Sequence, residues 1–480
     1  MRADPSHSFM SPFSRTRQNL TVASLAFAGM GASFMQTILV PIQGILPQLL
    51  DAAPSDTAWV ITVTLLAAAV STPIVGKLGD MFGKRRVAII LMSILLLGSL
   101  LCTVTTGLGW LIFGRALQGL GMGVIPLGIS LLRDIVDSQR LGTSIALVSA
   151  TLGVGGAIGL PVSALVTEYL DWKMLFALAA AFAAVALALI VAVVPRTGVR
   201  SGGRVDIIGA LGLAVGLVGV LLGISQGNSW GWTSAPILAS LAIGVVALIA
   251  WGIYELRIEN PLVDLRVSVK PAVLTTNLAS VAMGFALFSS TIAFPQLLQL
   301  PLDTGGMGLD LLTASLLLMP SGLAMLAMSP VAGRIERSAG PRPLLIAAGA
   351  IIAIAYAVCV VLPLGAVQIA AVNAVIGIGI GLGYAAMPAL IMAAVPRSET
   401  GAANGLNTLM RSFGTTVASA LVGSILASSS GAGGTEAFTI VFVLGLIAAV
   451  ICTILAFMVP RPVPVDEMVN PAAAVPTAAE

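Results

Sequence analysis

The stretch Gly76-Lys-Leu-Gly-Asp-Met-Phe-Gly-Lys-Arg-Arg86 decides the fold, because it joins two long apolar segments through a short polar turn. Gly79 and Gly83 allow the chain to turn sharply between two helices. The three consecutive cations at its end favour the anionic, cytoplasmic face of a membrane, and Asp80 is a carboxylate among them. The stretch predicts a cytoplasmic loop between two membrane-spanning helices; a purely topological role for its charges is the alternative.

The composition of the 480 residues excludes a water-soluble globular protein. Apolar residues make up 58% of the chain and charged residues only 9%, whereas soluble proteins carry roughly 25% charged residues. A fold of this size cannot hide so much apolar surface from water, so its solvent is lipid. The basic residues behind the net charge of +3 are spread over short loops, which argues against a nucleic-acid partner.

Cysteine and histidine usage predicts neither a disulfide framework nor a metal site. Cys102, Cys359 and Cys452 each lie inside an apolar segment, and the one histidine is His7, in the polar N-terminal stretch. We expect no metal and no cofactor. The apolar stretch that follows is longer than a signal-peptide core, so we expect it to be retained as the first helix.

The chain contains fourteen runs of the roughly 20 apolar residues that a helix needs to cross a membrane. They lie near residues 21–46, 57–78, 86–106, 109–132, 142–166, 173–195, 206–226, 235–254, 273–299, 308–334, 343–363, 366–394, 401–428 and 437–459. A transmembrane β-barrel would show short alternating segments instead. The prediction is an all-α membrane protein with fourteen transmembrane helices.

The distribution of Lys and Arg supports this count. With both termini in the cytoplasm, twenty of the 23 basic residues fall in cytoplasmic loops or tails, as the positive-inside rule requires. Lys173 falls outside, and Arg115 and Arg411 lie within helices. Scarce Lys beside Arg, with abundant Ala and Gly, suggests a bacterial source. We therefore expect a multi-pass protein of the bacterial cytoplasmic (inner) membrane.

An internal repeat relates the second and tenth predicted helices. The segments that run from Thr72 to Arg85 and from Ser329 to Arg342 match at a constant offset of 257 residues, at Pro73/Pro330, Gly76/Gly333, Gly83/Gly340 and Arg85/Arg342. Helix two corresponds to helix ten only if helices seven and eight are an insertion. Repeated halves around a central site are a transporter design, and chance similarity between two Gly-rich basic turns is the alternative.

Taken together, several stretches resemble the major facilitator superfamily, and within it the fourteen-helix drug:proton antiporters of the EmrB/QacA type. The 76–86 stretch is similar to the signature loop between helices two and three. The segment Arg115-Ala-Leu-Gln-Gly-Leu-Gly121 is similar to the fourth-helix motif, and Gly153 to Pro161 to the motif associated with antiporters. Further matching stretches are Arg204-Val-Asp206, Trp230-Gly-Trp232, Glu255, Pro261-Leu-Val-Asp-Leu-Arg266, Phe294-Pro-Gln-Leu-Leu-Gln299 and Asn407-Thr-Leu-Met-Arg-Ser-Phe-Gly414.

The resemblance covers about residues 20–460 and implies a major facilitator fold, with two six-helix bundles and two extra central helices. The expected organisation is a cytoplasmic N-terminal tail, an N-terminal six-helix bundle, a linker carrying the extra helix pair, a C-terminal six-helix bundle and a cytoplasmic C-terminal tail. The corresponding residues are 1–20, 21–195, 196–272, 273–459 and 460–480.

For the 76–86 loop the resemblance implies conformational gating. Asp80 would hold the two bundles together on the cytoplasmic side, at the positive N-terminus of a facing helix. The residues to which we assign this role are Gly76, Gly79, Asp80, Gly83, Lys84 and Arg85.

Proton coupling needs a titratable group in the transport path, yet none of the 20 acidic residues lies near the middle of a predicted helix. Where relatives carry an Asp in the first helix, this chain reads Phe34-Met-Gln-Thr37. Arg115 costs at least ~2.5–3.5 kcal/mol to bury in a membrane, so we assign it to coupling; snorkelling to the outer surface is the alternative. Asp310 and Asp134 are the acidic candidates, and a solvated loop position is the alternative for Asp310.

Small residues in the fifth helix predict close helix packing. Gly155, Gly159 and Ser163 are spaced four residues apart and form one face that lets another backbone approach; Pro161 lies within it. The chain departs here from the family pattern, which has a Gly-Pro step and then a Gly pair. A conformational role and ordinary packing both remain open.

Polar residues inside the helices predict a substrate cavity. Arg411 lies near the midplane of the thirteenth helix with amides on neighbouring turns, and a structural polar network is the alternative. The predicted cavity residues are Gln36, Thr37, Gln43, Gln118, Gln296, Gln299, Asn404, Asn407 and Arg411.

The predicted function is secondary active, multidrug-type efflux of small amphipathic compounds by proton antiport with alternating access, with the protein acting as a monomer. No phosphate-binding Gly-rich loop is present, so ATP is not expected as the energy source. Uptake or export of a specific metabolite or lipid is the alternative. A membrane-embedded enzyme would need acid–base groups at membrane depth, and a non-transporting sensor would not need both intramembrane arginines.

Overall fold

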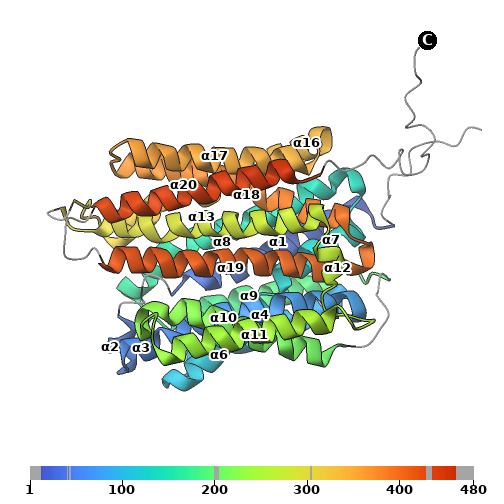
Figure 1. Cartoon of the computed structure of the whole chain (residues 1–480), viewed down its shortest axis with the longest axis horizontal. Helices are drawn as coiled ribbons and strands as arrows, with labels where there is room; N and C mark the ends of the chain where they lie inside the picture. Colours follow the sequence, from blue (N-terminus) through green and yellow to red (C-terminus); the bar gives the residue numbers. More distant parts are fainter. Residues whose placement is uncertain are drawn as a thin grey trace, which may run out of the picture.

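The computed structural model describes residues 12–39, 42, 45–198, 205–302, 305–428 and 435–460, and within these ranges every regular element is a helix. Thirteen of the helical segments are long and apolar enough to cross a membrane. Figure 1 shows them side by side along the long axis of the molecule. The remaining long helix, α1 (Arg15–Thr37), is not among the thirteen.

Within the part of the chain that the structure describes, the N-terminal half has six long helical segments. After α1 come two short helices, α2 (Leu46–Leu50) and α3 (Pro54–Thr57). The other long segments are α4 (Trp59–Phe82), α5 (Lys84–Val104), α6 with α7 (Leu108–Gly121 and Val124–Ile135), α8 (Ser138–Tyr169) and α9 (Met174–Val193).

The C-terminal half also consists of six long helical segments. They are α13 (Pro271–Gln299), α14 to α16 (Leu311–Leu318, Pro320–Ala327 and Ser329–Ala339), α17 (Pro341–Val361), α18 (Ala366–Ala394), α19 (Thr400–Ser428) and α20 (Thr435–Met458). The third of these six segments, α17, begins at Pro341. The tenth span is divided into three helices because Pro320 and Pro330 interrupt the hydrogen-bond ladder. Short helices α12 (Leu265–Ser268) and η2 (Arg397–Glu399) precede α13 and α19.

Each half has its own apolar core. One buried cluster runs through α1 and α4 to α9, and a second runs through α13 to α20. The halves meet where α4 packs on α19 and where α8 packs on α14, α15, α16 and α18. Two cores joined along two helix seams are the arrangement expected for two bundles.

The extra helices α10 (Ile207–Trp230) and α11 (Ala235–Glu255) form a hairpin outside both bundles. Asp206 caps α10 by accepting a hydrogen bond from the Gly209 N–H at 2.8 Å, and the Tyr254 hydroxyl of α11 donates to the same oxygen at 3.0 Å. Of this pair, α10 packs against both α4 and α19. The hairpin therefore lies across one seam between the halves, below α19 in Figure 1.

The internal repeat is visible in the backbone. Gly83 and Gly340, which are 257 residues apart, both adopt positive φ, at 99° and 82°, and each separates two long helices. The arginines two residues later also correspond. Arg85 donates to the Val191 carbonyl at the end of α9, and Arg342 donates to the Phe457 carbonyl at the end of α20. The same turn and the same capping contact thus occur once in each half.

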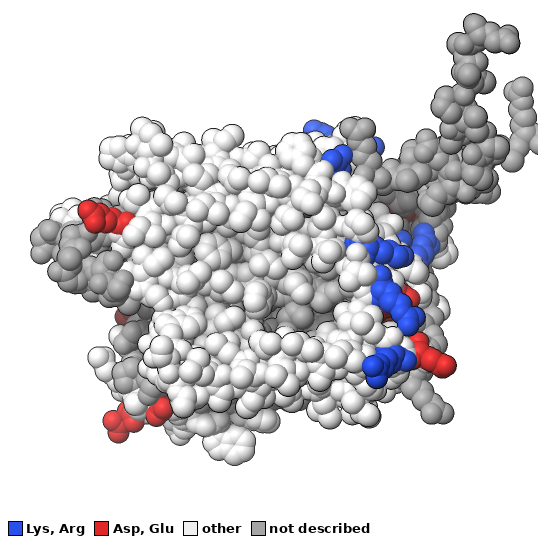
Figure 2. Space-filling view, in the orientation of Figure 1, with Lys and Arg blue, Asp and Glu red and all other residues white. Residues whose placement is uncertain are grey.

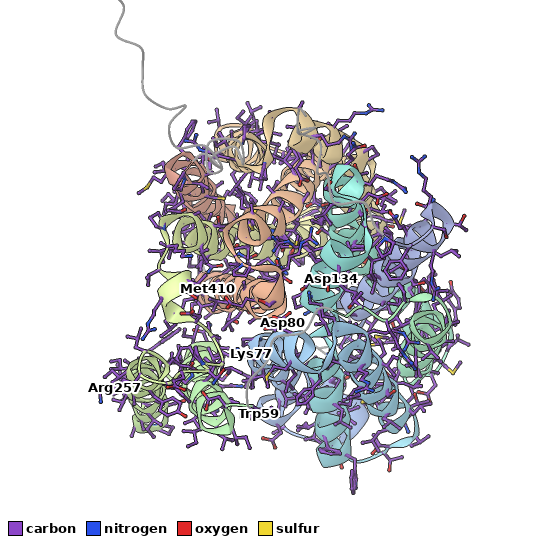
Figure 3. The ribbon with its side chains drawn as sticks, turned by 90° about the vertical axis from the view of Figure 1, so that its right-hand side faces the viewer. Trp59, Lys77, Asp80, Asp134, Arg257 and Met410 are labelled. Carbon is purple, nitrogen blue, oxygen red and sulfur yellow. The ribbon has the colours of Figure 1, made fainter. Side chains whose placement is uncertain are left out.

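Charged side chains gather at the two ends of the molecule. Figure 2 shows a middle band without Lys, Arg, Asp or Glu on the visible face, with Lys and Arg concentrated at one end. This end, which we call the basic end, carries Lys77, Asp80 and Arg257 and faces the viewer in Figure 3. An uncharged band between charged ends is what a lipid bilayer requires.

The first predicted span, 21–46, was wrong at both ends. Helix α1 begins at Arg15, because the Ser14 side chain accepts a hydrogen bond from the Arg17 N–H and caps it, and it ends at Thr37. The first turns of this helix therefore include residues that were assigned to the N-terminal tail.

Helix α8 packs closely on α1 through the predicted small-residue face. A Cβ atom at Gly155 would lie 2.2 Å from the Met30 carbonyl oxygen, and one at Gly159 would lie 2.0 Å from Thr37 Oγ1. The Ser163 hydroxyl donates to the Ile38 carbonyl at 2.6 Å, and Pro161 is buried within the same helix. The small residues at these positions allow the two backbones to approach.

This packing predicts opposite outcomes for two neighbouring substitutions. Gly155→Ala forces a methyl group against the α1 backbone and should lower the melting temperature by at least about 3 °C. At Gly156, a Cβ would lie 3.5 Å from Ser33 Oγ, an ordinary contact. Gly156→Ala should leave the melting temperature unchanged or raise it, because Ala is favoured over Gly in helices by ~1 kcal/mol. The buried free cysteines allow both to be measured with a thiol-reactive dye. Equal melting temperatures would contradict this account.

Candidate functional site

A carboxylate of the N-terminal half binds the N-terminus of a helix in the C-terminal half. Asp80 Oδ1 accepts a hydrogen bond from the Gly401 N–H at 3.1 Å, and Oδ2 accepts one from the Ala402 N–H at 3.0 Å. These are the first backbone donors of α19, where the helix dipole favours a negative charge. Asp80 is only 1% exposed, so water does not compete for these bonds.

Glycines bring the two helices close enough for this contact. A Cβ at Gly76 would lie 2.2 Å from the Gly401 carbonyl oxygen, and one at Gly401 would lie 2.4 Å from the Gly76 carbonyl oxygen. One turn further along the seam, a Cβ at Gly405 would lie 2.5 Å from the Thr72 carbonyl oxygen. Any larger side chain would therefore move α4 away from α19. Gly79 has a packing role as well, because its missing Cβ leaves room for Leu127.

Lys84 is part of this contact. Its ammonium nitrogen lies 2.8 Å from Asp134 Oδ2 and 3.7 Å from Asp80 Oδ1, and it donates to Thr400 Oγ1 at 2.9 Å. Lys84 is 1% exposed, so its charge does not lie at the anionic membrane face as expected for the three cations, but inside the contact to which we assign a gating role. Asp134 is buried with it, and Ser130 shares a hydrogen bond with Thr400. Figure 3 shows Asp80 and Asp134 close together at the basic end.

The second seam, where α8 packs on α14, α15, α16 and α18, is also closed at the basic end. A Cβ at Gly333 of α16 would lie 2.1 Å from Thr143 Oγ1 of α8, and Arg337 donates to the same hydroxyl at 2.7 Å. The Glu336 carboxylate lies against Gly142, in the first turns of α8. Both seams therefore end in a charged or polar contact between the halves.

Arg115 is enclosed by the N-terminal half. It is 1% exposed and donates hydrogen bonds to the carbonyls of Val60 and Met35 and to Gln118 Oε1, at 3.1, 3.2 and 2.7 Å. Gln118 is fully buried and donates to Ser99 at 2.8 Å. The predicted cavity position of Gln118 was therefore wrong: its polar atoms are used inside the bundle. Arg115 reaches α1 at Met35, next to the predicted cavity residue Gln36.

Gln36, Thr37, Gln296 and Gln299 occupy less buried positions. Gln36 and Gln296 are exposed, and Thr37 and Gln299 are half-buried. Gln36 contacts Met122 Sδ, and Gln299 donates to the Pro295 carbonyl of its own helix. Gln43 lies outside the described residues.

The predicted cluster on α19 divides into two parts. Asn407 is buried and donates to Asn277 Oδ1 at 2.9 Å and to Ser280 Oγ at 2.7 Å, both on α13. Asn404, also buried, donates to the Thr400 carbonyl of its own helix. Arg411 is half-buried, and its guanidinium carbon lies 4.4 Å from the centre of the Tyr384 ring, a cation–π contact. The asparagines thus stabilise the bundle, and Arg411 alone of this cluster retains an accessible side chain.

Asp310 caps a helix in an exposed position. Its Oδ2 accepts a hydrogen bond from the Thr313 N–H at 2.9 Å, and the hydrogen bonds from Thr313 lower the pKa of Asp310. A lowered pKa keeps this carboxylate ionised at neutral pH, so it is poorly suited to pick up protons there. The assignment of Asp310 to coupling finds no support in this position.

Sequence reasoning missed several residues of these networks, namely Ser99, Ser130, Asn277, Tyr384 and Thr400. The one available signal was at Thr400, which follows Pro396-Arg-Ser-Glu, a pattern typical of the start of a helix. The others are isolated polar residues in apolar segments, and their partners come from distant parts of the chain.

Comparisons with known proteins agree with this architecture. The family profile described as Major Facilitator Superfamily matches residues 25–418 and 366–479. The lincomycin resistance protein LmrB of Listeria monocytogenes is 27% identical over 365 residues, which cover 75% of this chain and 76% of LmrB. YhcA of Bacillus subtilis, an MFS-type transporter, is 26% identical over 289 residues, and the chain spans only 53% of its length.

A solved structure has the same fold. The proton:xylose symporter XylE superposes with a TM-score of 0.67 at 13% identity, over 93% of this chain and 97% of that one. Thirteen helices within the described residues are long and apolar enough to cross a membrane, so the chain is a multi-pass membrane protein. The family profile and the relatives indicate a transporter rather than an enzyme. Because the family profile matches most of its length, the chain belongs to the Major Facilitator Superfamily.

Proposed function

We propose that the protein is a drug-type efflux transporter that exports small amphipathic compounds by alternating access, driven by proton antiport. The observation that carries this proposal is the buried contact of Asp80 with the N-terminus of α19. It joins the two halves by a buried charged contact at the basic end, as expected of a gate at that end. The relative LmrB, a lincomycin resistance protein, supports a drug as the cargo.

The fourteen-helix drug:proton antiporter branch is the proposed place of the chain within its family. The hairpin α10–α11 between two six-helix sets supports it. The domain boundaries at 21–195, 196–272 and 273–459 are part of the same proposal. We also propose a bacterial inner-membrane location with both termini cytoplasmic, which makes the basic end the cytoplasmic end. The monomer is the proposed working unit.

For coupling, the buried pair of Asp134 and Lys84 is the best-supported acidic site. Asp134 is one ionic contact away from Asp80 through Lys84, so protonation of Asp134 would free the Lys84 charge and change the gate. The proposed electrostatic role of Arg115 is supported by its complete burial without a carboxylate partner among the described residues. Arg411 is the proposed substrate contact of the C-terminal half.

A specific metabolite or lipid as the natural cargo is the second candidate. Exposed amides such as Gln36 and Gln296 and the absence of a carboxylate from the predicted cavity set favour neutral or anionic molecules over multivalent cations. An efflux-deficient host that expresses the chain and is screened against both drugs and metabolites would separate the two candidates.

Asp80→Asn tests the gate. The substitution removes the charge and one of the two acceptors, and hydrogen bonds to a charged group contribute about 1.5–3 kcal/mol each. We expect efflux from inverted vesicles to slow by about tenfold or more, while the substrate Kd changes by less than about twofold. Asp171→Asn, at an exposed loop position, is the matched control. Loss of binding with an unchanged conformational cycle would contradict the gate.

Arg411 tests the substrate contact. Arg411→Ala should abolish efflux, and Arg411→Lys should reduce it severalfold, because Lys keeps the charge but loses the planar donor fork. Expression should stay normal in both variants, since removing a buried charge does not hinder insertion. Arg257→Ala, an exposed arginine at the basic end, is the control. Normal efflux by the Ala variant would remove Arg411 from the site.

Reporter fusions test the orientation. Alkaline phosphatase should be active when fused after Gly227 or Ser429, and green fluorescent protein should be fluorescent when fused after Gly202 or Ser338, if both termini are cytoplasmic. A reversed signal at one of the four positions would mean that a helix has been miscounted.

A further inference from the structure

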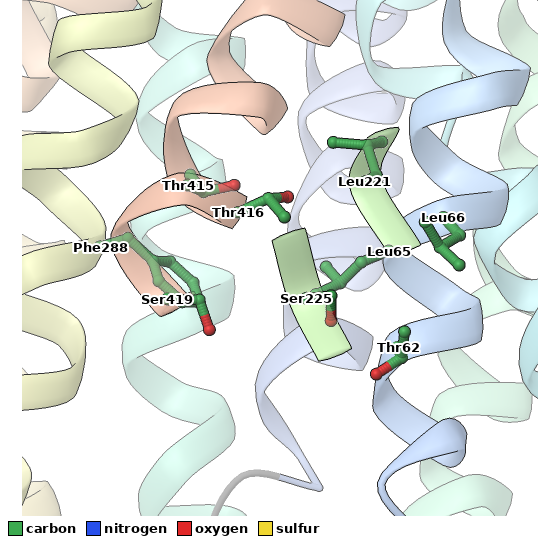
Figure 4. A pocket seen from close by; sticks show the side chains of 9 residues that line it. All are labelled: Thr62, Leu65, Leu66, Leu221, Ser225, Phe288, Thr415, Thr416 and Ser419. Carbon is green, nitrogen blue, oxygen red and sulfur yellow. The ribbon is translucent and has the colours of Figure 1, made fainter. Parts of the chain in front are cut away.

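A small pocket lies on the seam between the two halves, at the end opposite the basic end. Figure 4 shows it between α4 and α19, with α10 in front and α13 beside α19 at the left. Its lining residues are Thr62, Leu65, Leu66, Leu221, Ser225, Phe288, Thr415, Thr416 and Ser419. Thr62 and Leu66 lie three and seven residues after the start of α4, so the pocket is about 5–10 Å from that helix end.

Five of the nine lining residues carry a hydroxyl group, and none is charged. The hydroxyls of Thr415 and Thr416 donate to the Ser412 carbonyl at 2.8 and 3.0 Å, which leaves their oxygen lone pairs available. Among the described residues, the hydroxyls of Thr62, Ser225 and Ser419 make no hydrogen bond. The hydroxyl oxygens of these three residues are not among the fully buried atoms that lack a partner, so they are accessible from the pocket and free to bond with a group that enters it. Three such groups at one place point to a bound polar group.

The hairpin closes this pocket toward the nearer end of the molecule. Asn228 of α10 donates to the Ala420 carbonyl of α19 at 2.9 Å, and Ser424 of α19 donates to the Asn228 side chain. On the other side of the pocket, the Trp230 ring of α10 lies 6.4 Å from the Trp59 ring of α4. The pocket is therefore bounded by both halves and by the hairpin that bridges them.

We propose that this pocket binds the polar group of an uncharged amphipathic molecule at the seam, which deepens the proposed function and rests on it. Its free space, ≈ 20 Å³, holds about one water-sized group, such as a hydroxyl or a carbonyl oxygen. The hydroxyls of Ser225, Ser419 and Thr62 supply donors and acceptors, and Phe288 with the three leucines contacts the apolar part. A cation would find no carboxylate here, so the site selects neutral molecules.

Photolabelling of the full-length protein in lipid nanodiscs tests this site. The probe is 4-[3-(trifluoromethyl)diazirin-3-yl]benzyl alcohol, an uncharged aryl alcohol that forms covalent bonds on illumination. We expect peptides that contain residues 59–66 and 415–419 to be labelled at least threefold more than α11. This helix is the reference for unspecific labelling from lipid, since only 11% of its span is buried.

The combined variant Ser225→Ala, Thr416→Val and Ser419→Ala removes hydroxyls at nearly constant shape, and we expect it to reduce labelling at these peptides at least threefold. The single variant Ser225→Ala serves if the combined variant does not fold. Thr103→Val is the matched control, because that hydroxyl bonds within its own helix, to the Ser99 carbonyl. The proposed binding site would be rejected if its peptides were labelled no more than α11, or if labelling were unchanged in the variants. The pocket would then be one that holds water only.

Efflux by the unmodified protein is measured in a second experiment. It distinguishes the proposed export function from the proposed binding pocket. Efflux without labelling at the seam would retain the transporter and reject the pocket. Specific labelling without efflux of any compound would retain the pocket and reject the export function.

Discussion

The carboxylate of Asp80, buried between the halves and bonded to two backbone N–H groups of α19, is the contact on which the basic end depends. A buried charge needs partners, and here every partner belongs to the opposite half or to the Lys84–Asp134 pair. Separation of the halves would leave the carboxylate without its donors unless water enters at the same time. The contact is therefore all-or-none, as required of an element that has two discrete states.

The close approach of α4 and α19 is a condition for this contact. Two N–H bonds near 3 Å require the backbones of the two helices to approach closely, and Gly76 and Gly401 allow this by having no side chain. The hairpin α10–α11 covers the same seam from outside and bonds to α19 through Asn228. One seam thus carries two sets of features: a charged contact with its glycine crossing at the basic end, and a bridged pocket toward the other end.

The features of the fold that depend on a local sequence pattern could be predicted from the sequence. Apolar length predicted the helices, and the offset of 257 residues predicted the repeated turns at Gly83 and Gly340, because only a backbone of positive φ demands glycine there. The seam partners could not be predicted in the same way. That Asp80 faces a helix N-terminus was expected from the family resemblance, but nothing near Asp80 in the chain identifies α19 as that helix. Lys84 was assigned to the gating loop, but its pairing with Asp134, fifty residues away in the chain, was not predicted.

Cations held by the helices were the hardest feature to interpret, and Arg115, Lys84 and Arg411 have different physical solutions. Arg115 is satisfied by two backbone carbonyls and an amide, so its charge is retained in a fully enclosed site. Lys84 is satisfied by carboxylates. Arg411 has an aromatic ring at 4.4 Å and remains half-buried, so of the three its guanidinium is the one that can still gain a partner. A sequence shows that burying each cation costs free energy, but it does not show which groups in the fold bond to that cation. Those partners decide whether the charge is structural or available to a substrate.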